Sequence, residues 1–254
     1  MTNFRIQVAY DGSRYNGWQR LGDTDNTIQS KLERVLGEML GHKVEIFGAG
    51  RTDAGVHARA QIAHFKIHTE MTADAVRAYL NRYLPEDIAV LDCAVVDDRF
   101  HARLNAVGKR YVYRIWNSDT PNVFERKYLY RMEQPLALDA MRAGAARLVG
   151  RHDFKAFCGN KKMKKSTVRE LYRIDVERLG DEVRLTFVGS GFLYNMVRIL
   201  TGTLVEIGEG KRSPAELDAL FDSRDRLQAG VTMPPQGLTL AQVYYERQPD
   251  WPAQ

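Results

Sequence analysis

The sequence predicts an α+β protein built from two halves in tandem, each with the order strand, helix, strand, strand, helix, strand. The 254 residues are 44% hydrophobic and 27% charged, a composition typical of a globular chain long enough for two small domains. Stretches with alternating apolar residues and stretches with 3.6-residue apolar spacing follow one another in the same order twice. Because no low-complexity linker separates the two series, we expect the halves to share one continuous sheet.

The first half begins with an alternating strand at residues 4–10. A helix is predicted from about Thr27, with apolar residues recurring on one face until Gly41 ends it. Thr72 is the predicted N-cap of a second helix, which stops before Pro85. Three further strands are predicted at KVEIFGAG (43–50), QIAHFKI (61–67) and IAVLDCAVV (88–96).

The second half repeats this order from residue 105 onward. A helix at 136–150 is expected to close at Gly150, and two alternating strands are expected to meet at a turn formed by Gly180 and Asp181. The other elements are predicted as strands at 110–116, 171–179, 182–189 and 238–246 and as helices at 193–207 and 214–221. Each half, residues 1–104 and 105–254, is therefore ferredoxin-like or RRM-like (βαββαβ), with a mainly antiparallel sheet and helices on one face.

Composition also limits the cellular setting. No stretch approaches the roughly 18 apolar residues of a membrane span, and MTNFRIQVAY contains no signal-peptide block, so we expect a cytoplasmic protein without membrane contact. Cys93 and Cys158 lie in apolar contexts and form no CxxC pair, which predicts reduced, buried thiols.

Basic residues are unevenly distributed, although the net charge is only +5 and the pI about 9.1. Residues 99–114 contain five basic side chains and no acidic one, and residues 155–173 contain seven against Glu170 alone. Such clusters favour a polyanion such as RNA, but solvated basic loops fit the pattern equally well. The densest cluster consists of Lys161, Lys162, Lys164 and Lys165.

The segment GAGRTDAGVHA is the strongest candidate for chemistry. Gly48, Gly50 and Gly55 surround Arg51 and Asp53, so the backbone there can turn sharply and approach a ligand. Asp53 is a candidate nucleophile or base, and Arg51 a candidate for orienting it, binding phosphate or displacing a base. An Asx-turn or helix cap beside a glycine-rich turn explains the same spacing.

Three histidines lie close together in the sequence, at His57, His64 and His68. They form no HExxH motif and no cysteine joins them, so the spacing gives little support for a metal site. We expect them to be surface or RNA-facing residues.

In FHARLNAVGKRYVYRI, Tyr111 and Tyr113 occupy alternate positions of a strand, so both rings project from one face. Arg110 is one of several arginines beside them, and this combination suits stacking on an unpaired base. Aromatic packing in a core explains either ring considered alone.

Taken together, YDGSRYNGWQ, GAGRTDAGVHA, FHARLNAVGKRYVYRI, GFLYNMVRILTGTLVEIGEGK and PPQGLTL resemble the successive motifs of the tRNA pseudouridine synthase A (TruA) family, in that family's order. RTDAGVHA is the most specific of them. The resemblance implies a homodimer without cofactor or metal, whose two RRM-like halves meet at a catalytic cleft. It implies isomerisation of uridines on the 3′ side of the tRNA anticodon stem-loop, at tRNA positions 38 to 40.

The same resemblance assigns roles to four residues. It implies that Asp53 is the catalytic aspartate, Arg51 the arginine associated with flipping the target base, and Tyr111 the tyrosine that stacks on the uracil. It also implies that Arg198 is the cleft arginine that pairs with the catalytic carboxylate. For Arg110 and the four lysines, contact with tRNA is an expectation from charge.

Two other functions fit parts of the sequence. A non-catalytic RNA-binding protein explains the basic clusters and tyrosines, but the chain lacks the RRM stacking motif and this reading gives Asp53 no purpose. A metal-dependent hydrolase using the histidines would require stoichiometric zinc. The sequence does not separate attack by Asp53 on C1′ of the ribose, addition to C6 of the base and abstraction of a sugar proton.

Overall fold

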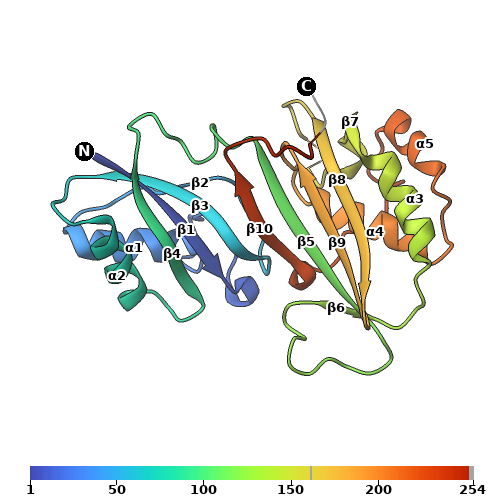
Figure 1. Cartoon of the computed structure of the whole chain (residues 1–254), viewed down its shortest axis with the longest axis horizontal. Coiled ribbons are helices and arrows are strands. Elements are labelled where there is room, and N and C mark those ends of the chain that lie inside the picture. The colour runs from blue at the N-terminus through green and yellow to red at the C-terminus, as the bar shows by residue number, and fades with distance from the viewer. Residues whose placement is uncertain (161, 252–254) are drawn as a thin grey trace. The chain divides into compact units, whose positions relative to one another are not determined.

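The computed structural model describes residues 1–160 and 162–251, and the chain divides into two compact units. The first unit comprises residues 1–106 and 239–245, and the second comprises residues 107–238 and the described residues from 246 onward. Figure 1 shows helices and mainly antiparallel strands in both units, which confirms the predicted α+β class.

In the first unit the strands run in the order β4-β1-β3-β10, and β2 pairs with β3. β1 is antiparallel to both β3 and β4, whereas β10 is parallel to β3. The elements are β1 (Thr2–Tyr10), α1 (Ile28–Leu40), β2 (Phe47–Gly48), β3 (His57–Ile67), α2 (Ala73–Tyr83), β4 (Ile88–Val96) and β10 (Leu238–Tyr244). Sequence order places β10 in the second half, but its backbone pairing groups it with β3.

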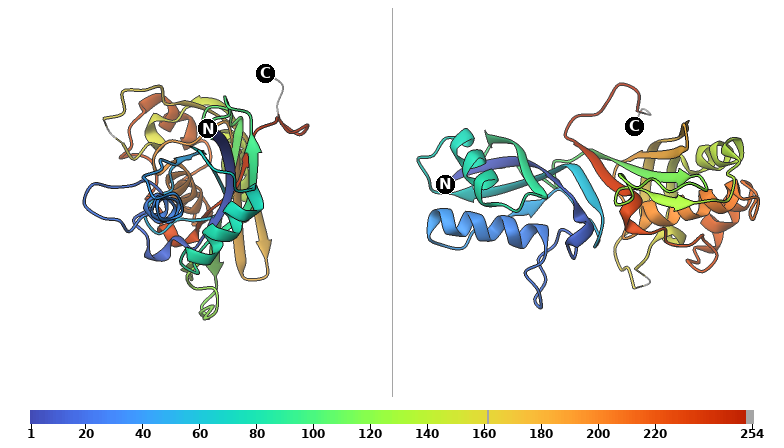
Figure 2. Two further views of the ribbon diagram at one scale, coloured as in Figure 1. Left: turned by 90° about the vertical axis from the view of Figure 1, so that its left-hand side faces the viewer. Right: turned by 90° about the horizontal axis from the view of Figure 1, so that it is seen from below.

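One face of the β1 strand is packed into the core. Phe4, Ile6, Val8 and Tyr10 are buried, while the residues that alternate with them, Arg5, Gln7 and Ala9, are partly exposed. This alternation is that of a sheet covered on one side. Figure 2 shows α1 as a layer of its own beside the strands of this unit.

The predicted caps of the first-unit helices are confirmed. Thr27 accepts a hydrogen bond from the Ser30 N–H, and Gly41 adopts the left-handed conformation that ends α1. Thr72 caps α2 in the same manner, and the helix ends one residue before Leu84 and two before Pro85.

The strand expected at residues 43–50 is much shorter, since only Phe47 and Gly48 pair with β3. The backbone of Ile46 is bound instead by α1: its N–H donates to Glu33 Oε1 at 3.1 Å and its carbonyl accepts from Gln29 Nε2. Side chains of the helix thus make the hydrogen bonds to the Ile46 backbone that a neighbouring strand would otherwise make.

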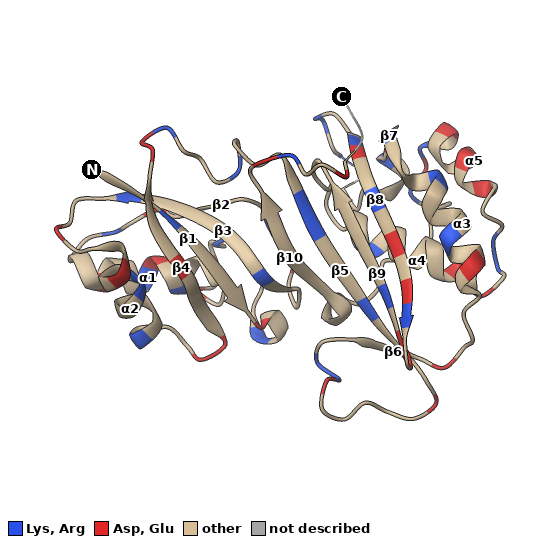
Figure 3. Ribbon diagram, in the orientation of Figure 1, with Lys and Arg blue, Asp and Glu red and all other residues tan. Residues whose placement is uncertain are grey.

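In the second unit the strand order is β5-β9-β8-β7, all antiparallel, and the short β6 runs parallel to β5. The elements are β5 (Gly108–Asn117), β6 (Tyr130–Met132), α3 (Leu138–Leu148), β7 (Gly150–Asp153), β8 (Val168–Leu179), β9 (Glu182–Gly189), α4 (Met196–Gly208) and α5 (Glu216–Ser223). Charged residues lie along β8 and its neighbours (Figure 3).

Two predictions in the second unit are wrong in detail. Gly150 does not close α3, which ends at Leu148; Gly150 begins β7 at a φ of 112°. The helix expected from residue 193 starts at Met196, because Asn195 adopts a left-handed conformation with a φ of 58°. Neither the sheet partner of Gly150 nor the conformation of Asn195 is visible in apolar spacing.

Cys93 and Cys158 are buried free cysteines, as predicted. Burial raises the pKa of the Cys93 thiol to about 11. Within the described residues, no helix has the length and apolarity needed to cross a membrane.

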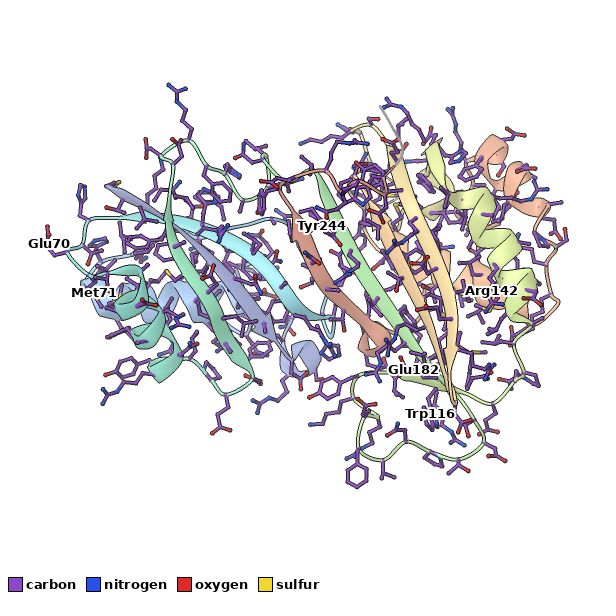
Figure 4. All side chains as sticks on the ribbon, viewed as in Figure 1. Glu70, Met71, Trp116, Arg142, Glu182 and Tyr244 are labelled. Carbon is purple, nitrogen blue, oxygen red and sulfur yellow. The ribbon has the colours of Figure 1, made fainter. Side chains whose placement is uncertain are left out.

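Glu182 begins β9 (Figure 4) and forms a partly buried ion-pair network. Its carboxylate accepts hydrogen bonds from Arg114 at 2.6 and 3.0 Å and from Arg184 at 2.9 Å. Burial raises the pKa of Glu182, but the hydrogen bonds from the two arginines outweigh it, so its pKa lies below the usual range.

We expect Glu182→Gln to lower the free energy of unfolding by about 1 to 3 kcal/mol at pH 7, because it weakens charge-assisted hydrogen bonds. A lowered native pKa stabilises the fold above the ordinary glutamate pKa of about 4.3, and this contribution disappears as the pH falls through the native pKa. Urea unfolding between pH 3 and 7 should therefore show the two proteins converging in acid. A difference that grows below pH 4 would contradict this assignment.

Candidate active site

Asp53 lies in the loop of residues 50–56 between β2 and β3, which we call the Asp53 loop. Its backbone carbonyl accepts a hydrogen bond from the Val56 N–H at 3.1 Å, closing a tight turn. Thr52 beside it is buried, Asp53 is half-buried and Arg51 is exposed. A carboxylate held in such a turn stays accessible while its backbone is fixed.

A second loop, residues 11–19, supports the Asp53 loop along its whole length. The Gly55 N–H donates to the Tyr15 carbonyl at 3.3 Å, and the Trp18 N–H donates to the Thr52 carbonyl at 3.0 Å. At the start of β3, His57 Nδ1 accepts from the Gly12 N–H at 3.1 Å. The supporting loop therefore binds backbone groups on both sides of Asp53.

Two glycines of the supporting loop allow this close approach. A Cβ atom at Gly12 would lie 2.0 Å from the Val56 carbonyl oxygen, and one at Gly17 would lie 2.5 Å from the Thr52 carbonyl oxygen. Gly17 also has a φ of 90°, a conformation that disfavours other residues. These contacts leave no room for a side chain between the two loops.

Arg51 is held from the same loop. Its Nε donates to Gln19 Oε1 at 2.9 Å, although the side chain is exposed. An exposed guanidinium with one fixed contact keeps its remaining N–H groups available for a ligand.

In the second unit, Tyr111 and Tyr113 lie on the same face of β5, as predicted, but their surroundings differ. Tyr113 is fully buried and its hydroxyl donates to the Pro234 carbonyl at 2.8 Å. Tyr111 packs edge-to-face against Phe192 with ring centroids 5.1 Å apart. Tyr113 is therefore a core residue with a satisfied hydroxyl, which gives position 113 a structural role.

Arg198 lies in the first turn of α4 and is held at two atoms. Its Nε donates to the Met233 carbonyl at 2.6 Å and its Nη1 donates to Asn195 Oδ1 at 3.1 Å. The Met233 N–H returns a hydrogen bond to the Arg198 carbonyl at 3.2 Å. The guanidinium thus has a fixed orientation before any ligand binds.

The remaining basic candidates, Arg110 and the lysine cluster, lie in different segments of the second unit. Arg110 lies on the face of β5 opposite Tyr111 and is half-buried, and its Nε is buried without a hydrogen-bond partner among the described residues. In the lysine cluster, the side chains of Lys162, Lys164 and Lys165 are exposed, whereas Lys161 lies outside the described residues.

The expectation that all three histidines face the surface is wrong for two of them. His57 and His64 are buried, and each accepts a backbone N–H at Nδ1, from Gly12 and Ala102 respectively. Burial, with smaller effects of His101 and Lys66, lowers the pKa of His64 to about 4, so it stays a neutral acceptor. In the described part of the chain, no group of three or more His, Cys, Asp or Glu side chains is arranged to hold a metal ion.

The structure thus brings Arg51 and Asp53 together in one braced loop of the first unit, and it places Tyr111 and Arg198 in the second. Sequence reasoning missed Gln19 and Asn195, whose side chains accept hydrogen bonds from Arg51 and Arg198.

Comparisons with known proteins point in one direction. A family model described as tRNA pseudouridine synthase matches residues 6–105 and 145–246. The chain is 47% identical over 230 residues to a tRNA pseudouridine synthase A of Bacillus sp. strain KSM-64, covering 91% of this chain and 94% of that protein. It is 44% identical over 247 residues to the tRNA pseudouridine synthase A of an Exiguobacterium strain, covering 97% and 99%.

Among solved structures, a Cbf5-Nop10-Gar1 complex matches 93% of this chain and 48% of its own chain, with 14% identity and a TM-score of 0.39. At that score the likeness adds nothing to the assignment.

The glycine contacts predict that Gly12→Ala lowers the free energy of unfolding by about 1 to 3 kcal/mol, because the methyl group would separate two packed backbones. Gly22→Ala is the matched control, since nothing lies within 4 Å of a Cβ there. Urea unfolding of both variants measures the effect. Equal stability of the two variants would show that the loops separate without cost.

Proposed function

Because the chain belongs to the tRNA pseudouridine synthase family, we propose that it isomerises uridine to pseudouridine on the 3′ side of the tRNA anticodon stem-loop, with Asp53 as the catalytic carboxylate. Membership of this family makes it an isomerase that acts on tRNA uridine. The observation that carries the role of Asp53 is its position in a turn braced on both sides by backbone hydrogen bonds.

The reaction explains why these residue types are needed. The C1′–N1 glycosidic bond breaks, the uracil turns while bound, and a C5–C1′ bond forms. One proton leaves C5 and one arrives at N1, so nothing is gained or lost in net terms. A carboxylate serves either as the nucleophile or as a base in this sequence.

The target uridine must first leave the helical stack, which costs a few kcal/mol. In this proposal the exposed guanidinium of Arg51 fills the gap, since Gln19 holds only its Nε. Tyr111 stacks on the extruded uracil. Arg198, already oriented by Met233 and Asn195, pairs with Asp53 and keeps it ionised in a water-poor site.

The wider setting is also part of the proposal. Residues 1–104 and 105–254 are proposed as the two functional halves of the chain. Two chains are proposed to form a homodimer in the cytoplasm. The proposal includes no metal and no organic cofactor, as the family resemblance implies. Arg110 and the lysine cluster, Lys161 included, bind the tRNA backbone.

Asp53→Asn should abolish pseudouridine formation and leave tRNA affinity nearly unchanged, because the amide keeps the volume of the side chain but removes its charge. Single-turnover assays on tRNA and equilibrium binding measure the two effects. Asp25→Asn is a control of the same chemistry on an exposed residue of the same unit. Turnover of Asp53→Asn within about tenfold of wild type would remove this residue from the mechanism.

Changing Lys162, Lys164 and Lys165 to Gln should weaken tRNA binding. It should also reduce the slope of log affinity against log salt concentration by about 1 for each phosphate contact that is lost. The rate on saturating tRNA should not change, because these lysines position the substrate only. Binding titrations at several salt concentrations test this. The matched control changes three exposed lysines elsewhere, Lys43, Lys127 and Lys211. Equal slopes for the two triple variants would make the cluster a solvated loop.

A further inference from the structure

We propose that Tyr10 is a positioning residue for catalysis, which through Thr52 fixes the turn that presents Asp53. The inference rests on the proposed role of Asp53 as the catalytic carboxylate. It concerns a hydroxyl pair beneath the Asp53 loop and entirely within the first unit.

The contact between the two residues is short and buried. The Tyr10 hydroxyl lies 2.8 Å from Thr52 Oγ1, and the two residues are 5% and 6% exposed. Trp18 packs against the Tyr10 ring with centroids 6.1 Å apart. A hydrogen bond in such a dry site is stronger than one at the surface, and the loss of one partner leaves the other unsatisfied.

Thr52 is then held at its hydroxyl and at its carbonyl. Its side chain meets Tyr10 from the sheet below, and its carbonyl accepts the Trp18 N–H from the supporting loop. That carbonyl belongs to the peptide whose N–H is that of Asp53. Fixing both groups of Thr52 therefore fixes the peptide plane from which the Asp53 side chain departs.

The sheet supplies a second support through Gln61. A bulge in β3 pairs Val8 with Gln61 and Tyr10 with Ala58, so that the fully buried Gln61 lies diagonally across from Tyr10 on the core face. Gln61 Nε2 donates to the Gly50 carbonyl at 2.9 Å. The end of β1 and the bulge thus hold the Asp53 loop at residues 50 and 52.

The chemistry of Tyr10 separates positioning from proton transfer. Burial raises the pKa of its phenol far above the usual value, and the polar side chains of Thr52 and Gln61 only partly oppose this. Tyr10 therefore stays protonated at every working pH. It orients its neighbours and takes no proton from the substrate.

Two substitutions remove the contact from its two ends. Tyr10→Phe deletes the phenol oxygen, and Thr52→Val replaces the threonine hydroxyl by a methyl group of similar size. Thr52→Ser keeps the hydroxyl and should rescue activity. The matched control is Tyr245→Phe, which deletes a half-buried hydroxyl of the same unit that donates to the Ala102 carbonyl at 2.8 Å, outside both the Asp53 loop and the supporting loop.

We expect Tyr10→Phe and Thr52→Val each to lower the single-turnover rate on saturating tRNA by about 10- to 100-fold, as for a displacement of reacting groups near 1 Å. The affinity for tRNA should stay within about twofold in both variants, and the double variant should be no slower than the slower single one, since the two changes break one contact. Tyr245→Phe and Thr52→Ser should keep the wild-type rate. Thermal unfolding of all variants records any common loss of stability.

Three results would overturn the proposal: a Tyr10→Phe rate within twofold of wild type, a loss confined to tRNA affinity, or an equal loss of rate in Tyr245→Phe. If Tyr10→Phe does not fold, the comparison of Thr52→Val with Thr52→Ser decides the question alone. Failure of the underlying function is a separate result, because it requires Asp53→Asn to remain active. If Asp53→Asn is active and Tyr10→Phe is slow, the contact between Tyr10 and Thr52 contributes to the rate, but not by positioning a catalytic Asp53.

Discussion

The candidate site depends on the direct contact between two backbones, that of the supporting loop and that of the Asp53 loop. Gly12 and Gly17 lie so close to the carbonyls of Val56 and Thr52 that a methyl group has no space between them. Every polar group placed in this contact must then be satisfied within it, because water is excluded. The carbonyl of Thr52 and the ring of His57 meet that requirement through hydrogen bonds to the supporting loop.

The same requirement explains which parts of the chain were predictable. Thr27 and Thr72 cap helices through their own side chains and local backbone, so their roles follow from short-range sequence. Ile46 was predicted in a strand because its apolar context is strand-like, yet its backbone is bound by two side chains of α1. Local patterns cannot show which distant side chain will satisfy a given N–H.

The site residues divide in the same way. The sequence marks Asp53 and Arg51 as candidates because glycines and charged residues share one short segment, whereas Tyr111 and Arg198 are proposed from the family resemblance. Tyr10 and Gln61 were not predictable, since each looks like an ordinary strand residue until a bulge in β3 places them on a diagonal. His57 and His64 were expected at the surface for a related reason. The backbone N–H groups that donate hydrogen bonds to them belong to Gly12 and Ala102, which are far away in the sequence.

A second constraint operates in the second unit, at residues 233–237. Successive carbonyls there, those of Met233 and Pro234, accept hydrogen bonds from Arg198 and from the Tyr113 hydroxyl. The carbonyls of Met233 and Pro234 each belong to a peptide group whose nitrogen is that of a proline, so these two peptide groups accept hydrogen bonds and have no N–H to satisfy. This one segment therefore ties α4 to the buried face of β5, so that the orientation of Arg198 and the packing of the strand that carries Tyr111 depend on the same few peptide groups.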